Sequence, residues 1–162
     1  MSENASGNIP VRQDVLDRLR AALPGILAGQ PVLLAYLYGS VAEGCALPGS
    51  DVDVALVLEP GHGLSAYQRM QMELRIAAEL EARCDLPQAD VRSVNDAPVM
   101  AQGTVLTEGV LVYSRDEDFR ADFEVLTRKR YFDFRPVARM MQRAYFEHMG
   151  ADLRHQGFLA DG

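Results

Sequence analysis

The chain has 162 residues, of which 48% are hydrophobic and 24% are charged. This apolar content is enough to bury the core of one compact domain without disulfide bonds or structural metal ions, and it excludes a disordered or fibrous chain. The formal net charge of −7 argues against a protein that coats nucleic-acid backbone, because that contact depends on basic surface. We therefore expect no direct nucleic-acid partner.

The cysteines and the N-terminal segment indicate a cytoplasmic protein. Cys45 and Cys84 lie far apart, with no CxxC spacing and no nearby histidine cluster, so neither a zinc site nor a disulfide framework is predicted. The first ten residues lack a basic region followed by an apolar stretch. No window approaches the roughly 20 apolar residues of a membrane span, so no membrane association is expected.

The first third of the chain reads as a helix followed by a buried strand. Residues 1–10 are expected to form a flexible N-terminus, and a helix is predicted to run from about residue 11 to Pro24, where Pro-Gly breaks or kinks it. The short apolar run 32–38 is rich in strand formers and ends at Gly39. It predicts a buried strand.

The middle of the chain predicts two more strands joined by a helix. Residues 40–50 contain too many glycines and prolines for a long element, and 52–58 then reads as a second buried strand. A helix is predicted from about residue 64 to 84, with Ser65 as its cap. This helix can cross over to a third strand at 89–94.

The last third predicts a further helix, a short strand and one or two long helices. The segment Asn95-Asp96-Ala97-Pro98 is a good helix start and Gly109 a plausible stop, before a short strand over 110–113. The C-terminal helices extend to residue 149, with Pro136 as a kink or boundary. The layout is α/β (α+β), with a small mixed sheet in one domain over 11–149 and a loose tail over 150–162.

One stretch carries the chemistry of a metal site: Gly39-Ser40, ten residues, then Asp51-x-Asp53. On a strand alternate side chains share a face, so the two carboxylates point the same way, about 6.5–7 Å apart along the backbone. Magnesium prefers such hard oxygen ligands. A second ion would need a further carboxylate, and Asp90 on the third predicted strand is the best-placed candidate.

The loop before these carboxylates has the residues of a phosphate cradle. Gly39 permits a tight exit from the strand and a close backbone approach, and Ser40 can give its hydroxyl and amide to a phosphate oxygen. Gly44 extends the same argument. We therefore predict that these three residues bind a nucleotide.

A simpler interpretation places Asp51 and Asp53 in solvent at a strand edge, after an ordinary Gly-Ser turn. Asp53, however, interrupts a run of Val, Ala and Leu that otherwise reads as wholly buried. An unpaired buried carboxylate is costly and needs a partner such as a metal ion. The full spacing between two buried strands favours the functional interpretation.

These residues resemble the signature of the polymerase-beta nucleotidyltransferase superfamily, and most closely its minimal nucleotidyltransferase branch. Similar segments at 89–98 and 109–113 extend the resemblance over about residues 11–146. The resemblance implies a small mixed sheet with helices on one side, and transfer of a nucleoside monophosphate, usually AMP from ATP. It also implies that Asp51, Asp53 and Asp90 bind Mg²⁺ while Gly39 and Ser40 hold phosphate.

The chain departs from the family pattern in two places. Relatives often carry arginine where this chain has Val41 or Glu43, so a basic phosphate contact is expected to be missing. Ser93 stands where relatives often have an acidic residue, although the metal role is assigned to Asp90.

The minimal branch implies an antitoxin that adds AMP to a tyrosine of a HEPN ribonuclease toxin, as a homodimer or in a hetero-oligomer with that toxin. Two alternatives stay open. One is a binding-only antitoxin that has lost catalysis and covers its toxin. The other is a small-molecule nucleotidyltransferase that modifies an aminoglycoside-type hydroxyl.

The C-terminal helical segment carries a stripe of aromatic and methionine side chains. We predict that the stripe is core, with a partner surface as the alternative. Its members are Tyr131, Phe134, Met140, Met141, Tyr145, Phe146 and Met149.

Overall fold

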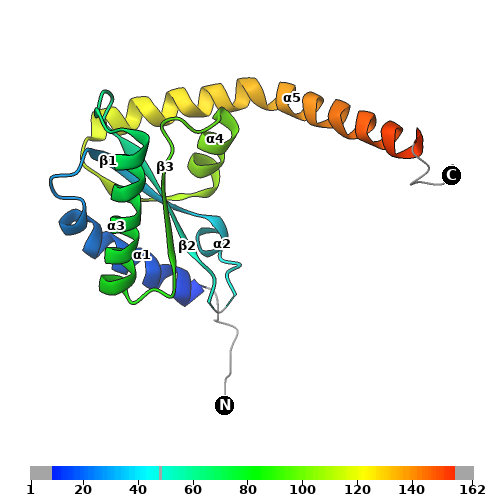
Figure 1. The fold of residues 1–162 in the computed structure, drawn as a ribbon. Coiled ribbons are helices and arrows are strands. Elements are labelled where there is room, and N and C mark those ends of the chain that lie inside the picture. Colours follow the sequence, from blue (N-terminus) through cyan, green and yellow to red (C-terminus); the bar gives the residue numbers. More distant parts are fainter. Residues whose placement is uncertain (1–8, 48, 156–162) are drawn as a thin grey trace, which may run out of the picture.

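The computed structural model describes residues 9–47 and 49–155, which form four strands and five helices (Figure 1). The α/β fold predicted from the sequence is confirmed. The elements in chain order are α1 (Ile9–Ile26), β1 (Val32–Tyr38), α2 (Gly39–Glu43), β2 (Val52–Leu58), α3 (Ala66–Cys84), β3 (Ala89–Ser93), α4 (Val99–Glu108), β4 (Val110–Ser114) and α5 (Glu117–His155).

The four strands form one mixed sheet in the order β3-β2-β1-β4. β1 pairs antiparallel with both β2 and β4, whereas β2 and β3 are parallel. A parallel pair needs a crossover connection, and α3 supplies it between β2 and β3. α3 begins at Ser65, whose side chain and that of Gln68 form a reciprocal capping box.

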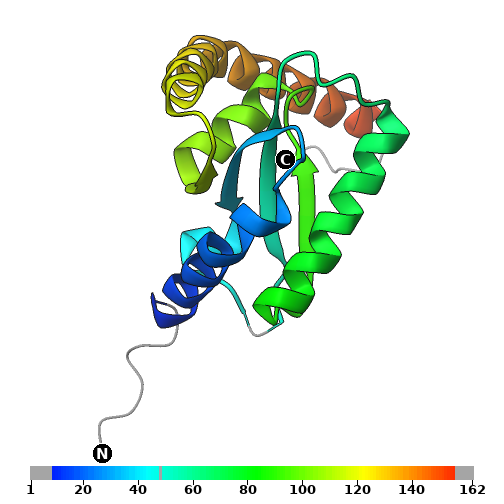
Figure 2. The same ribbon diagram turned by 90° about the vertical axis from the view of Figure 1, so that its left-hand side faces the viewer.

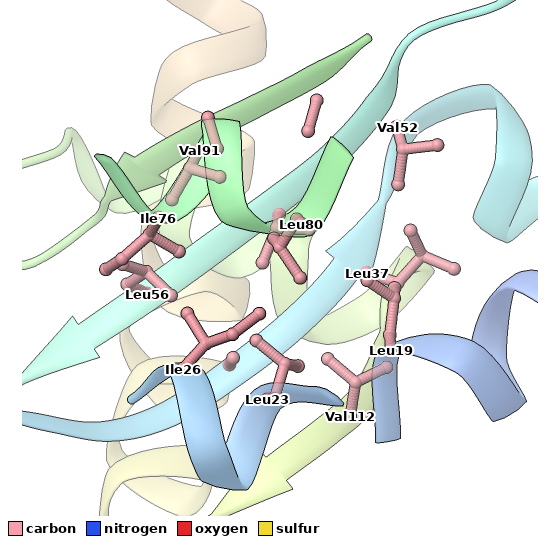
Figure 3. Close-up of a cluster of buried hydrophobic side chains, with 14 of the residues drawn as sticks. Leu19, Leu23, Ile26, Leu37, Val52, Leu56, Ile76, Leu80, Val91 and Val112 are labelled. Atoms are coloured by element: carbon pink, nitrogen blue, oxygen red, sulfur yellow. The ribbon is translucent and has the colours of Figure 1, made fainter. Parts of the chain in front are cut away.

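One face of the sheet is covered by α1 and α3 (Figure 2). Alternate side chains of the strands point into this core and meet the apolar stripes of the two helices. Figure 3 shows the packing, in which Leu19, Leu23 and Ile26 of α1 and Ile76 and Leu80 of α3 surround Leu37, Val52, Leu56, Val91 and Val112 of the strands.

The opposite face is covered by α4 and the first part of α5, so helices lie on both sides of the sheet and not on one side as expected. The reason is that β1 buries all its residues from Val32 to Leu37, which requires cover on both faces. Tyr36 of β1 anchors α5, because its hydroxyl donates to Glu124 Oε1 at 2.9 Å. Burial and this carboxylate raise the pKa of Tyr36, so the phenol stays protonated.

α1 and α5 both continue through the prolines at which a break or a kink was predicted, so neither proline ends its helix. α1 runs to Ile26, two residues past Pro24, because Leu23, Ile26 and Leu27 are all buried. α5 is a single helix of 39 residues that includes Pro136. Pro136 cannot donate to the carbonyl four residues earlier, but that residue is the exposed Phe132, so water can reach the carbonyl.

The chain ends expected to be loose lie partly outside the described residues. Of the N-terminal segment 1–10, residues 1–8 lie outside them and the last two begin α1. The tail expected from Gly150 is helical as far as His155, and residues 156–162 lie outside the described part. None of the helices that the structure describes is both long and apolar enough to cross a membrane.

The second half of α5 projects beyond the sheet and the other helices (Figure 1). A helix of this length spans roughly 58 Å, which is longer than the small sheet can cover. The prediction that its aromatic and methionine stripe is core is therefore wrong for most of the stripe. Tyr131 is buried, but Phe134, Met140, Met141, Tyr145, Phe146 and Met149 are exposed.

Gly103 tests how tightly α4 packs on α5. A Cβ at Gly103 would overlap the ring of Tyr131. We therefore expect Gly103→Ala to lower the free energy of unfolding by about 1–3 kcal/mol, although alanine is the better helix former by about 1 kcal/mol. Urea unfolding measures the change.

Gly25→Ala in α1 is the matched control, because its Cβ would meet only the tip of Arg83 at 3.4 Å. This variant should be neutral or slightly more stable. Equal stability of the Gly103 and Gly25 variants would show that α5 does not press on α4 at this point.

Candidate active site

Three polar side chains lie side by side across the sheet. Tyr38 of β1 pairs with Asp53 of β2, and Asp53 is in register with Asp90 of β3. Residues in register share a face of the sheet, so the two predicted carboxylates and the tyrosine point to the same side. The next pair on the same face of these two strands, Tyr36 and Ala55, belongs to the core beneath α4 and α5. The row formed by Tyr38, Asp53 and Asp90, called the polar rung below, therefore lies on the face of the sheet that α4 and α5 cover.

Negative charge is concentrated at this rung. Burial raises the pKa of Asp53, and the neighbouring Asp90 and Asp51 carboxylates raise it further. The pKa of Tyr38 is also raised, first by burial and then by Asp53 and Asp90. Asp51, just before β2, is exposed. The structure thus places Asp51 and Asp90 close enough to Asp53 for their charges to act on it.

Gly39 lies directly against the Asp53 carboxylate. Its φ of 74° is in the left-handed region, and a Cβ at this position would overlap Asp53 Oδ2. The residue before α2, Tyr38, makes no side-chain hydrogen bond to the amides of the first turn. Gly39 therefore presents bare backbone beside Asp53, and the half-buried Ser40 follows it in α2. Their phosphate role stays a prediction.

Gly44 has a different environment. It ends α2 with a φ of 75°, and its amide donates to Val41 O at 3.2 Å. No atom lies within 4 Å of where its Cβ would be, so backbone conformation alone explains the glycine. Gly44 lines a cavity of about 530 Å³ with Arg12 and Arg18 of α1. Its phosphate role stays a prediction.

The chemistry of the donor set fits a divalent cation such as Mg²⁺, because carboxylate oxygens are the ligands that it prefers. The three carboxylates are near one another but do not converge on one point: within residues 9–47 and 49–155, no group of three His, Cys, Asp or Glu side chains is arranged to hold a metal ion. Asp90 instead accepts a hydrogen bond from Arg92 Nε at 3.1 Å.

Sequence reasoning missed Tyr38 and Arg92 as members of the site. Both could have been found from the strand period, because Arg92 lies two residues after Asp90 and Tyr38 ends the strand that pairs with Asp53. Ser93, which stands in place of an acidic residue, donates its amide and hydroxyl to Glu73 Oε1 of α3, at 2.8 and 2.6 Å. These two hydrogen bonds connect β3 to α3.

Val41, the first position in this loop that departs from the family pattern, is buried in the core. Glu43 is exposed at the end of α2, and its Oε2 lies 3.6 Å from Cys45 Sγ. Cys45 and the buried Cys84 are both free thiols.

A family model described as "Polymerase beta, Nucleotidyltransferase" matches residues 23–118, a span that contains the whole site. No curated protein matches the sequence significantly. Among solved structures, a chain of a toxin–antitoxin complex with AMP-PNP is 19% identical, with a TM-score of 0.62 over 78% of this chain and 98% of that chain.

Two further solved structures have the same fold. A chain of the complex of tri-AMPylated Shewanella oneidensis HEPN toxin with MNT antitoxin is 18% identical, with a TM-score of 0.57 over 83% of this chain and 98% of that one. A chain of the MntA-HepT toxin–antitoxin pair is 18% identical, with a TM-score of 0.57 over 79% of this chain and 97% of that one.

Gly39 and Gly44 form a matched pair, because both have φ near 75° but only Gly39 faces a carboxylate. Both alanine variants incur the cost of a left-handed backbone, about 1–2 kcal/mol. Gly39→Ala should lose about 1–3 kcal/mol more in urea unfolding, because its methyl group displaces Asp53.

Adding Asp53→Ala to Gly39→Ala should recover most of the extra loss, since the overlap is then removed. Gly39→Ala and Gly44→Ala variants of equal stability would contradict the close contact between Gly39 and Asp53.

Proposed function

We propose that this chain, which belongs to the polymerase beta nucleotidyltransferase family, is an antitoxin that transfers AMP from ATP to a tyrosine of a HEPN ribonuclease toxin. The observation that carries the proposal is the rung of Tyr38, Asp53 and Asp90, with Gly39 packed against Asp53. We place the reaction in the cytoplasm, where the two free cysteines stay reduced.

Each predicted site residue has a role in this reaction. Asp51, Asp53 and Asp90 would hold Mg²⁺, which when bound neutralises their charge and that of the phosphates. The amides and hydroxyl of Gly39 and Ser40 would bind phosphate oxygens, and Gly44 would keep the loop in its turn. Fixing the triphosphate in one position is the main task, because phosphoryl-type transfer depends mostly on positioning and charge stabilisation.

The transfer itself exchanges a phosphoanhydride bond of ATP for a phosphoester bond to tyrosine. The tyrosine oxygen of the acceptor bonds to the α-phosphorus of ATP, and the bond from that phosphorus to the bridging oxygen breaks. Pyrophosphate leaves with the bonding electrons, and the phenol proton passes to solvent. The product is an AMP ester of tyrosine, which brings negative charge to the acceptor.

A toxin as acceptor is supported by the solved complexes of similar fold, which pair an antitoxin with a toxin, and one of which holds a tri-AMPylated HEPN toxin. In this chain α5 offers a surface for such a partner. Thr127, Phe134 and Met141 are seven residues apart and share one helix face, but only Thr127 is buried. An apolar face that continues past the domain suits a partner protein.

Binding-only neutralisation is the second candidate. Two observations favour it: the exposed apolar face of α5, and the pairing of Asp90 with Arg92, which engages a predicted metal ligand. No feature of residues 9–47 and 49–155 favours a small-molecule acceptor over a protein.

Incubation of the chain with a HEPN toxin, ATP and Mg²⁺ tests the proposal. We expect the toxin to gain AMP units on tyrosine by intact-mass and peptide mass spectrometry, and to stay inactive after the chain is removed. Asp51→Asn with Asp53→Asn should reduce transfer at least about 1,000-fold, because the charge that holds the cation is lost.

Circular dichroism and the melting temperature of the double variant serve as the folding control. Inhibition without a mass gain, persisting in the double variant and reversed by separation, would establish binding-only neutralisation. A mass gain that survives in the double variant would refute the assignment of the carboxylates.

Docking through α5 is tested by changing the charge by one unit on the apolar face and on the polar side of the helix. Met141→Glu should weaken toxin binding at least about tenfold, because a charge replaces a buried apolar contact. Arg143→Gln makes the same change in net charge at an exposed residue on the polar side of the helix and should have little effect. Biolayer interferometry measures both.

ATP affinity should be unchanged in both variants, since both residues lie in the half of α5 that projects beyond the sheet (Figure 1). Equal toxin affinity of the two variants would exclude this face as the docking surface.

A further inference from the structure

Arg92 is a charged residue beside the site for which the family signature gives no role. It follows Asp90 by two residues on β3, so both side chains leave the same face of the strand. Arg92 Nε donates to Asp90 Oδ1 at 3.1 Å. The two side chains are 69% and 41% exposed, so this contact can break without disturbing the core.

The site needs positive charge beyond that of a cation. Asp51, Asp53 and Asp90 are all acidic, and α2 carries no basic side chain and ends on Glu43. A triphosphate would bring further negative charge to the same end of the sheet. Preorganised cationic donors are the usual means of binding such charge.

Arg92 is placed to supply that charge. Its positive charge reaches the rung, because it opposes the effect of Asp53 and Asp90 on the pKa of Tyr38. The nearby Glu73 also faces Arg92, but both the amide and the hydroxyl of Ser93 already donate to Glu73 Oε1. The planar guanidinium can bind either a carboxylate or a phosphate through two parallel hydrogen bonds.

We propose that Arg92 is a phosphate-binding residue that exchanges partners: it pairs with Asp90 when no nucleotide is bound, and it turns to the triphosphate of ATP when a divalent cation takes Asp90. This inference rests on the proposed function and adds a regulatory element to the same site. The pairing competes with the cation in the absence of ATP and releases Asp90 when ATP and the cation arrive together.

The proposal predicts changes of opposite sign in two binding measurements on the full chain. Arg92→Gln should bind Mn²⁺ alone about two- to fivefold more tightly by electron paramagnetic resonance, because a competing surface ion pair is removed. The same variant should bind ATP in the presence of Mg²⁺ at least about tenfold more weakly by calorimetry, because a charged hydrogen bond is lost. Arg92→Lys keeps the positive charge but loses the planar guanidinium, so its ATP affinity should lie between those of wild type and Arg92→Gln.

Arg75→Gln is the matched control. It removes the same charge from an exposed arginine of α3, whose Nη2 contacts Gln30 Oε1 at 3.5 Å, near the opposite end of β1. Any of three results would overturn the proposal. They are an unchanged ATP affinity in Arg92→Gln, an equal loss of ATP affinity in Arg75→Gln, and changes of the same sign in the Mn²⁺ and ATP affinities of Arg92→Gln. Wild-type chain that binds ATP while Arg92→Gln has no effect would overturn this inference alone, whereas wild-type chain that binds no ATP would overturn the proposed function as well.

Discussion

Repulsion among the carboxylates of Asp51, Asp53 and Asp90 is the constraint on which the site depends. The sheet register fixes Asp53 beside Asp90, and the strand period places Asp51 on the same face. Because Asp53 is half-buried, water screens this repulsion only in part. The fold holds like charges together at a cost in stability that a bound cation would offset.

The rest of the fold supplies the rigidity that this arrangement requires. β1 is buried on both faces, by α1 and α3 on one side and by α4 and α5 on the other, so the rung at its end has a fixed position. Gly39 then turns the chain at the rung itself, where any side chain would collide with Asp53. Positioning of this kind is what nucleotidyl transfer demands of a protein.

Local patterns were sufficient to predict the four strands and the mixed sheet, because buried apolar runs and the Gly-Ser and Asp-x-Asp spacing are properties of short segments. They did not reveal that α5 is unbroken at Pro136, since that depends on whether water reaches the freed carbonyl. The exposure of Met141 and Tyr145 was also missed, because the same period marks a core face and a docking face. The pairing of Arg92 with Asp90 could not be predicted from the sequence either, because it depends on the side-chain conformations that the structure shows.

The melting temperature of Asp53→Asn in metal-free buffer tests the central claim most directly. The pKa of Asp53 is raised in the folded state, so its ionised form destabilises the fold at neutral pH and this penalty disappears as the carboxyl takes up a proton. We predict that Asp53→Asn melts above wild type at pH 7 in EDTA, and that this difference in melting temperature shrinks as the pH falls towards 4. Asp51→Asn, at an exposed position, should raise the melting temperature less. An Asp53→Asn variant that melts below wild type at pH 7 would contradict the claim that these carboxylates repel one another.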